Sequence, residues 1–489
     1  MAENRYRKLM SIFLLLVICS LLVYIVLRAY YLSFTHDECL SFKIVTGDKG
    51  IARTANDHLL NTWLMSVFYR LFGGQEIFLR LPNILGFIIY SFFTYKILIK
   101  TNNIFLMLLG ASLLLLNPYL LDFFSLARGY GLSLGFGLGA LYYLFRQESF
   151  ITYKQYILSL SFSFLFSLFS AYSNLFYINL NISLMIVFLI ELYLLRKNTA
   201  IQFDYKRKVT IALVFIFNLF FLFILINQIF KLKNTNELNF GGQNNFIDNI
   251  LTILIHRSIY FSYYGEQFWI SIRQMVIAVF AITIIYQIYS KKYSSLSKIT
   301  IMLFLMIFAT IMQHYMFEAT YPPARSSLIY ITLFALFIFY LLSDIYIIIH
   351  SKQYVKIVFN LLILLLLCLP LEWHFINSIN LKYTKEWQLD SNTKSVMKKI
   401  IELHENDIYK DRKITISNHW HFEPSINYYR ILYSMDYLTP ANRNGIDKNA
   451  NFIYCTKEEK EKSITDDGFS ILSEYKDTKT ILLEKSTCN

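Results

Sequence analysis

The sequence predicts an α-helical polytopic membrane protein that carries a small α/β domain outside the membrane. Only 16% of its 489 residues are charged and 56% are hydrophobic, whereas about 25% of the residues of a typical soluble domain are charged. Apolar runs long enough to cross a bilayer, which takes roughly 20 residues, recur along the chain up to Glu372. Beyond Glu372 the apolar runs shorten and charge increases.

About eleven segments have the length and composition of membrane spans. They are Leu9–Tyr31, Ile77–Leu98, Ile104–Leu120, Tyr130–Phe145, Tyr156–Tyr172, Leu175–Leu195, Val209–Phe230, Phe268–Tyr289, Ile299–Met316, Ser326–Ile349 and Val355–Leu371. No small-residue cleavage site follows the first run, so we interpret it as a retained span and not as a cleaved signal.

Basic residues alternate between the connections in the way that bilayer orientation requires. Short basic segments contain Arg5, Arg7 and Lys8; Lys96 and Lys100; Arg146 and Lys154; Arg196, Lys197, Lys206, Arg207 and Lys208; Lys291, Lys292 and Lys298; and Lys352 and Lys356. The positive-inside rule therefore predicts a multi-pass protein of the inner or plasma membrane whose N-terminus is cytoplasmic. The net charge of +13 resides largely in these connections. No nucleic-acid-binding motif accompanies it, so we expect no nucleic acid partner.

We divide the chain into a transmembrane domain, residues 1–372, with a first outer loop at 32–76, and a periplasmic or extracellular α/β domain, residues 373–489. In the second domain, Asn392–Glu405 is amphipathic and predicts a helix. Alternating segments predict strands at Lys413–Ser417, Asn451–Cys455, Phe469–Tyr475 and Lys479–Glu484. Cys455 and Cys488 are compatible with a disulfide in an oxidising compartment and equally with two free thiols.

The strongest chemical feature is the acid pair Asp37-Glu38, which lies just past the first span. A solvated pair of loop acids is the simplest interpretation of two adjacent carboxylates. The chemical alternative is a general base for an acceptor hydroxyl, which requires a raised carboxyl pKa. Carboxylate oxygens are also ligands for divalent cations, and the sequence leaves open whether the protein uses one.

The segments after the acid pair resemble a known enzyme family. His58 follows in the same loop, and the next span opens with Gly73-Gly74-Gln75-Glu76 and continues to Arg80-Leu81-Pro82. Ala127-Arg128-Gly129-Tyr130 and the late turn Tyr321-Pro322-Pro323-Ala324-Arg325 complete the pattern. In these motifs the chain resembles the GT-C glycosyltransferases of the protein O-mannosyltransferase and aminoarabinose transferase families. Leu59-Leu60-Asn61 replaces the Pro-Pro-Leu that is common in relatives.

This resemblance implies an inverting glycosyltransferase of the cell envelope, with a GT-C fold and a polyprenyl-phosphate-linked sugar as its donor. Asp37 would accept the proton of the acceptor hydroxyl, and Glu38 would position Asp37 or the sugar. A protein, a lipid and a glycan all remain open as the acceptor, and the sugar is not readable from the sequence.

Arginine suits the leaving phosphate because its guanidinium stays charged and can hold two phosphate oxygens. Arg128 and Arg325 are expected at outer helix ends, and Arg80 and Arg257 are further candidates for phosphate binding. For each arginine alone, a snorkelling or orienting role is the simpler interpretation. Their joint occurrence on the outer side, against the positive-inside bias, indicates an anion site.

Candidates for contact with the substrate are His58, Tyr130 and His256. His58 is also compatible with an interfacial loop position. The His-x-His spacing of His419-Trp420-His421 resembles a metal-binding motif. No third ligand accompanies it, so a surface strand or turn is the better interpretation.

Two other classes of function remain open. A transporter or flippase for a lipid-linked sugar would be expected to carry ionisable residues in mid-span, which are scarce here. A polysaccharide polymerase or ligase would use a pyrophosphate-linked glycan in place of a monophosphate-linked sugar.

Overall fold

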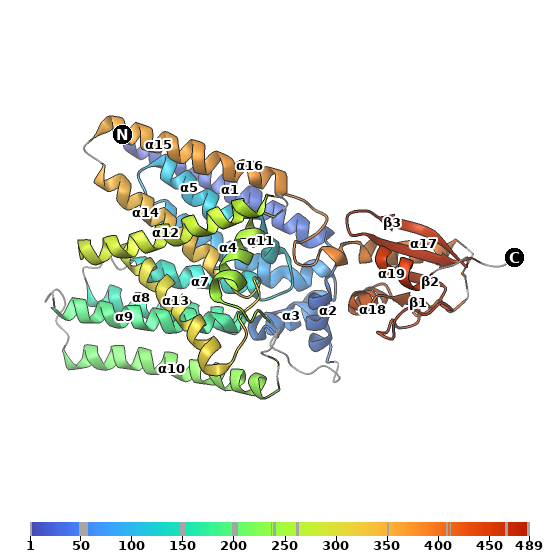
Figure 1. Cartoon of the computed structure of the whole chain (residues 1–489). Coiled ribbons are helices and arrows are strands. Elements are labelled where there is room, and N and C mark those ends of the chain that lie inside the picture. Colours follow the sequence, from blue (N-terminus) through green and yellow to red (C-terminus); the bar gives the residue numbers. More distant parts are fainter. Residues whose placement is uncertain are drawn as a thin grey trace.

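The structure is a computed structural model that describes residues 2–47, 57–146, 152–197, 204–235, 237, 241–260, 264–349, 352–406, 409–410, 412–464 and 468–486. A bundle of long helices forms one part of the molecule, and a small domain with a β-sheet extends from one end of it (Figure 1). The N-terminus lies at the other end of the bundle (Figure 1).

The bundle agrees with the predicted spans in position and differs from them in two details. Among the described residues, 9 helical segments are long and apolar enough to cross a membrane. They are α1 (Ala2–Tyr31), α4 (Glu76–Leu98), α8 (Tyr153–Ser173), η3 with α9 (Leu175–Tyr177, Ile178–Lys197), α10 (Tyr205–Asn234), α12 (Glu266–Ser290), α13 (Ser295–Phe317), α14 (Ile329–Ile348) and α15 with η5 and α16 (Gln353–Ile363, Leu364–Cys368, Leu369–Ser378).

The two details concern the third and fourth predicted spans. The third is broken: α5 (Ile104–Leu115) is bent by 51° from α6 (Pro118–Asp122) and η1 (Phe123–Ser125). Pro118 cannot continue the hydrogen bonding of α5, and Asn117 instead caps α6. The fourth, α7 (Tyr130–Phe145), has 16 residues, fewer than the roughly 20 that a perpendicular span needs. The broken span ends, and α7 begins, beside the first outer loop, where they hold side chains of the candidate site.

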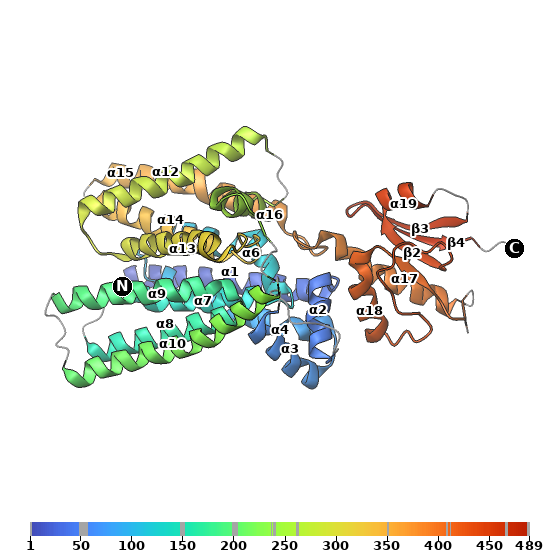
Figure 2. The same ribbon diagram turned by 60° about the horizontal axis from the view of Figure 1, so that its bottom comes forward.

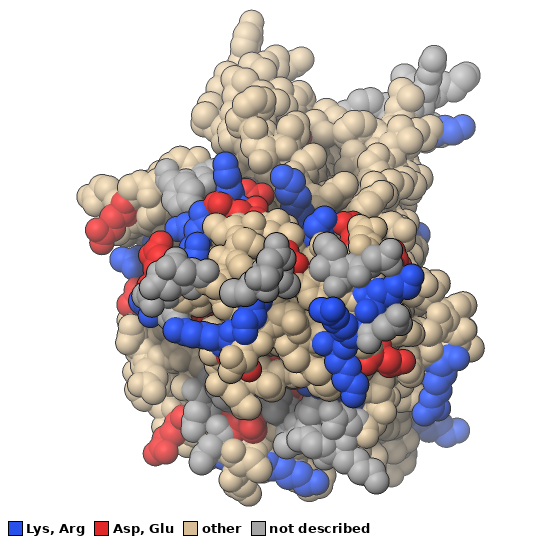
Figure 3. All heavy atoms as spheres, turned by 90° about the vertical axis from the view of Figure 1, so that its right-hand side faces the viewer, with Lys and Arg blue, Asp and Glu red and all other residues tan. Residues whose placement is uncertain are grey.

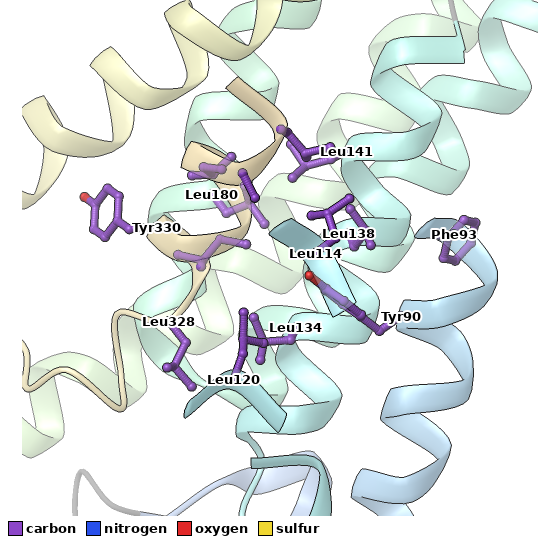
Figure 4. Packing of buried hydrophobic residues seen from close by; sticks show 14 of the residues in the cluster. Tyr90, Phe93, Leu114, Leu120, Leu134, Leu138, Leu141, Leu180, Leu328 and Tyr330 are labelled. Atoms are coloured by element: carbon purple, nitrogen blue, oxygen red, sulfur yellow. The ribbon is translucent and has the colours of Figure 1, made fainter. Parts of the chain in front are cut away.

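The core of the bundle depends on close approach of α4 to α7. A Cβ added at Gly135 would lie 2.4 Å from the backbone oxygen of Gly86, so neither position tolerates a side chain. Small residues permit such contacts between membrane helices, where packing replaces the hydrophobic effect as the driving force. Around this contact, Tyr90, Leu134 and Leu138 interdigitate with residues of other helices (Figure 4).

Four shorter helices lie toward the end of the bundle from which the sheet domain extends. The first outer loop forms α2 (His36–Val45) and α3 (Leu59–Phe72), which pack together beside the sheet domain (Figure 2). The long loop before α12 contains the π-helix η4 (Ile247–Thr252) and α11 (Ile253–Ser258).

The C-terminal domain has a four-stranded mixed sheet in the order β1-β2-β4-β3. The strands are β1 (Ile416–Asn418), β2 (Phe452–Thr456), β3 (Phe469–Tyr475) and β4 (Thr480–Lys485), and the helical elements are η6 (Gln388–Asn392), α17 (Thr393–Glu405), η7 (Trp420–Phe422), α18 (Glu423–Leu432) and α19 (Lys457–Ser463). The predicted helix and three of the strands are therefore confirmed to within a residue at each end, whereas β1 begins three residues after the start of the predicted Lys413–Ser417, and α18 and α19 were not predicted. Charged side chains of both signs are interspersed on this end of the molecule (Figure 3).

Only one of the two cysteines considered for a disulfide lies within the described residues. Cys455 is buried on β2 as a free thiol, and Cys488 lies outside the residues that the structure describes.

The contact between α4 and α7 yields a stability prediction. Gly135→Val should lower the thermal stability of the purified protein, by about 3 kcal/mol or more in free energy, because overpacking cannot be relieved against backbone. Thermal inactivation followed by fluorescence-detected size exclusion measures the change. Gly265→Ala is the control, because nothing lies within 4 Å of a Cβ added there. Equal melting of the two variants would contradict the assigned packing.

Candidate active site

The acid pair begins α2 and not an irregular loop. Thr35 is the N-cap, its hydroxyl accepts from the backbone N–H of Glu38, and the Glu38 carboxylate accepts from the backbone N–H of Thr35. This reciprocal arrangement is a capping box, and its pattern Thr-x-x-Glu was readable in the sequence. Asp37 therefore lies in the first helical turn, where the partial positive charge of the helix terminus favours a carboxylate.

Glu38 and Arg80 form a fully buried ion pair. Arg80 Nε and Nη2 lie 2.8 Å from the two Glu38 oxygens, and both side chains are 0% exposed. The remaining Arg80 N–H groups donate to the backbone carbonyls of Ala29, Leu32 and Ser33. All five donors of the guanidinium are thus used. Glu38 also accepts from the backbone N–H of Ala127, so the pair joins α1, α2, α4 and the turn before α7.

Asp37 faces two guanidinium groups at longer distances. Its Oδ2 lies 3.9 Å from Arg128 Nη2 and 3.8 Å from Arg325 Nη2, about 1 Å more than a charge-assisted hydrogen bond. Arg128 Nη1 donates to the backbone oxygen of Asp37 and to the hydroxyl of Ser41. The side chain of Arg325 is 29% exposed, whereas that of Asp37 is 10% exposed. Two arginines from segments far apart in the sequence therefore converge on one carboxylate.

His58 and Tyr130 form the adjoining wall. His58 Nδ1 lies 2.7 Å from the backbone oxygen of Ser173, which fixes Nδ1 as the donor. Burial, together with the charge of Arg128, holds the pKa of His58 well below its usual value, so the imidazole is neutral. Its buried Nε2 has no hydrogen-bond partner among the described residues. The ring lies edge-on to Tyr130, with the centroids 4.5 Å apart.

Gly129 makes this wall possible. A Cβ added there would lie 2.2 Å from the backbone oxygen of Ser173 and 2.8 Å from the Cβ of His58. The Arg128-Gly129-Tyr130 turn can therefore approach His58 only with glycine at its centre.

A second ion pair lies beside Arg325. Arg257 Nε on α11 is 3.2 Å from Glu386 Oε1, and the Tyr119 hydroxyl donates to the same oxygen at 2.7 Å. Trp387, the residue after Glu386, packs against Arg325: the guanidinium carbon of Arg325 lies 5.6 Å from the centroid of the Trp387 ring. Burial alone would lower the pKa of Arg325, but Tyr130, Asp37 and Glu386 outweigh burial and raise it, so Arg325 stays charged.

A further ion pair, which is buried, holds the segment that leads from the bundle to the sheet domain. Arg28 of α1 binds Asp122 and donates to the backbone oxygens of Asn380 and Tyr383. Asp122 also accepts from the Tyr260 hydroxyl and from the backbone N–H of Lys385. These bonds place Glu386 and Trp387 at the site.

The sheet domain contacts α2 through its histidines. His36 Nδ1 lies 2.7 Å from the backbone oxygen of His421, and the two rings stack 4.7 Å apart. Asp390 accepts from the backbone N–H of His36 and pairs with His421 Nε2 at 3.0 Å. The motif at 419–421 thus forms an interdomain contact.

Most of the predicted site residues are brought together, and one is not. Asp37, Arg128, Arg325, His58 and Tyr130 form one cluster, with the Glu38–Arg80 pair behind it and Arg257 adjacent through Glu386. His256 instead stacks on Trp269, 3.8 Å between centroids, on the exposed side of α11.

Sequence reasoning missed Arg28, Tyr119, Asp122 and Glu386. Asp122 offered a signal, because it is an acid inside an apolar run. Among the described residues, no group of His, Cys, Asp and Glu is placed to hold a metal ion.

The likeness to solved structures shows the GT-C fold that the sequence predicts. The chain is similar to the crystal structure of ArnT from Cupriavidus metallidurans bound to undecaprenyl phosphate, with a TM-score of 0.56 and 9% identity over 97% of this chain and 98% of that one. For the apo crystal structure of the same ArnT the TM-score is 0.52, with 10% identity over 96% and 97% of the chains. No protein-family model and no curated protein matches the sequence. At this identity the likeness establishes the fold alone.

The buried pair predicts unequal effects of neighbouring acids on stability. Glu38→Ala should cost about 3–5 kcal/mol, because it leaves Arg80 buried without its counter-ion. Asp37→Asn should cost less than Glu38→Ala, since both of its arginines lie at longer range and one of them, Arg325, partly reaches solvent. Chemical denaturation of the detergent-solubilised protein measures both. A larger loss from Asp37→Asn would contradict the assigned roles.

The interdomain contact predicts a pH dependence. Burial lowers the pKa of His421, but the hydrogen bond and charge of Asp390 outweigh burial and raise it overall. The protonated imidazole therefore stabilises the folded state fully below the unfolded pKa of about 6.5, and this contribution is lost as pH rises through the folded pKa.

The measurement is the difference in thermal stability between wild type and His421→Gln, which should be largest near pH 5.5 and shrink toward pH 8.5. Burial lowers the pKa of His36, which has the opposite sign and also depends on the charge of His421, so both proteins are compared in a His36→Gln background. A difference that does not vary with pH would contradict the assignment.

Proposed function

We propose that this protein is an inverting glycosyltransferase that moves a sugar from a polyprenyl monophosphate carrier to a hydroxyl acceptor. The observation that carries the proposal is the convergence of two guanidinium groups on one carboxylate. Asp37 Oδ2 lies 3.9 Å from Arg128 Nη2 and 3.8 Å from Arg325 Nη2, whereas Glu38 and Asp122 each pair with one arginine. Two guanidinium groups and the carboxylate of Asp37 are therefore held together within a nearly buried site.

This arrangement matches the chemistry of the donor. A phosphodiester between a sugar and a polyprenol carries one negative charge. When the acceptor oxygen attacks the anomeric carbon, the bond to the phosphate oxygen breaks, its electron pair leaves with the phosphate, and the acceptor proton passes to Asp37. The leaving phosphate then has two negative charges and Asp37 has none, so the cluster gains one unit of positive charge as the phosphate gains one of negative charge. Such preorganised compensation is how electrostatic catalysis works.

The neighbouring residues have consistent roles. Arg325, more exposed than Arg128, would bind the phosphate first, and Arg128 would hold the backbone of Asp37 while balancing the leaving group. The neutral His58 presents the lone pair of Nε2, which suits a sugar hydroxyl donor. Glu38 and Arg80 would position Asp37 and touch no substrate. Arg257 would extend the anion site, and His256 has no role in it.

The orientation follows from the same proposal. The N-terminus, the end of α9, the start of α10 and the end of α14 lie at the end of the bundle opposite the site (Figure 1). Basic residues gather in those connections, which supports a non-cytoplasmic location for the site and the sheet domain. The ArnT structure bound to undecaprenyl phosphate supports a polyprenyl phosphate as the lipid.

The test begins with the donor. Deleting the protein from the cell that produces it should cause one lipid-linked sugar to accumulate, which mass spectrometry identifies. With that donor, Asp37→Asn should reduce transfer by the purified protein about 10²- to 10⁴-fold, the range for loss of a general base. Donor binding should be retained. Asp477→Asn, a matched change at an exposed loop position, is the control.

Arg325→Ala should instead raise the KM for the donor about tenfold or more, because a charge-assisted contact with the phosphate is lost. Undiminished transfer by Asp37→Asn would remove the mechanism. Accumulation of a pyrophosphate-linked glycan would favour a polymerase or ligase.

A further inference from the structure

Glu386 occupies an unusual place for an acid, because it lies beside the arginines of a site that we propose binds an anion. Its Oε1 contacts Arg257 Nε and the Tyr119 hydroxyl. Its charge is also among the groups that raise the pKa of Arg325. The side chain is 12% exposed, so solvent screens these interactions only weakly.

The position of Glu386 is firmly fixed by the chain around it. Asp122 binds the backbone N–H of Lys385, and Arg28 binds the backbone oxygen of Tyr383. Trp387 is 5% exposed and lies under Arg325. A negative charge is therefore held in contact with Arg257 and one residue away from Trp387, which packs against Arg325.

Arg325 retains capacity for a further anion. Its buried Nε has no hydrogen-bond partner among the described residues. Arg257 is more open, with 36% of its side chain exposed. A phosphate at Arg325 would thus lie close to Glu386 and share its cations.

We propose that Glu386 is an internal counter-anion that weakens the binding of the lipid phosphate, and that it does so more for the dianionic product than for the monoanionic donor. This inference rests on the proposed function. Repulsion between fixed charges scales with the charge of the ligand. Glu386 would therefore favour release of the polyprenyl phosphate after transfer and act as a positioning residue that limits product inhibition.

The experiment compares two soluble probes that differ in charge. Farnesyl phosphate at pH 8 represents the dianionic product, and its methyl ester represents the monoanionic diester. Titration calorimetry of the full-length protein in detergent gives the Kd of each. Glu386→Gln keeps an oxygen that can accept from Tyr119 and Arg257 while removing the charge. Asp477→Asn removes one exposed negative charge elsewhere and is the control.

Glu386→Gln should lower the Kd of farnesyl phosphate about tenfold and that of the methyl ester about threefold, as expected for one fixed charge acting on two or one ligand charges. Under turnover it should lower the inhibition constant of the product. Equal changes for the two probes, or no tightening in a variant that elutes as the folded protein, would overturn the inference.

Arg325→Ala separates the two proposals. If this variant binds both probes as tightly as wild type, the proposed phosphate site is wrong. If it binds them more weakly while Glu386→Gln leaves the ratio of the two Kd values unchanged, the phosphate site stands and only the role of Glu386 fails.

Discussion

The buried pair of Glu38 and Arg80 is the interaction on which the candidate site depends. It connects the carbonyls at the end of α1, the first turn of α2, the second turn of α4 and the turn before α7. Every N–H of the guanidinium is satisfied, and the carboxylate receives two backbone donors in addition. Any displacement would leave a buried charge partly unpaired, which is costly. This pair therefore fixes the direction of α2 and with it the place of Asp37.

The sheet domain is a structural part of the site and not an appendage. The Tyr429 hydroxyl accepts from the backbone N–H of Phe34, immediately before the cap of α2, and the Tyr428 hydroxyl donates to the backbone oxygen of Gly74. Lys394 pairs with Glu76 at 2.8 Å across the same junction. Because these bonds are buried or partly buried, the sheet domain and the first outer loop support one another. A change at this junction is therefore transmitted to the first turn of α2.

The spans and strands could be predicted because their signals are local: apolar length, alternation, and turn residues. Asp37, Arg128 and Arg325 could be placed at one boundary because each follows or precedes a span end. The site residues of the segment that leads from the bundle to the sheet domain could not be predicted. Asp122 contacts Lys385, and Tyr119 contacts Glu386, across more than 260 intervening positions. No local pattern encodes such contacts. The place of His256 was equally unreadable, because it depends on which side of α11 faces Trp269.

In the sequence, Arg128 and Arg325 were the leading candidates and Arg80 and Arg257 were further ones, and geometry separates the four by the carboxylates that they meet. Arg80 is saturated by Glu38 and three carbonyls, and Arg257 shares Glu386 with Tyr119. Arg128 and Arg325 both face the carboxylate of Asp37. In a region where burial makes every uncompensated charge expensive, two guanidinium groups stay this close together only if the surrounding structure enforces it. Under the proposed function, this enforced pair is the preformed receptor for the phosphate. The placement of the arginines around Asp37, more than the presence of any one arginine, therefore supports this position for the phosphate.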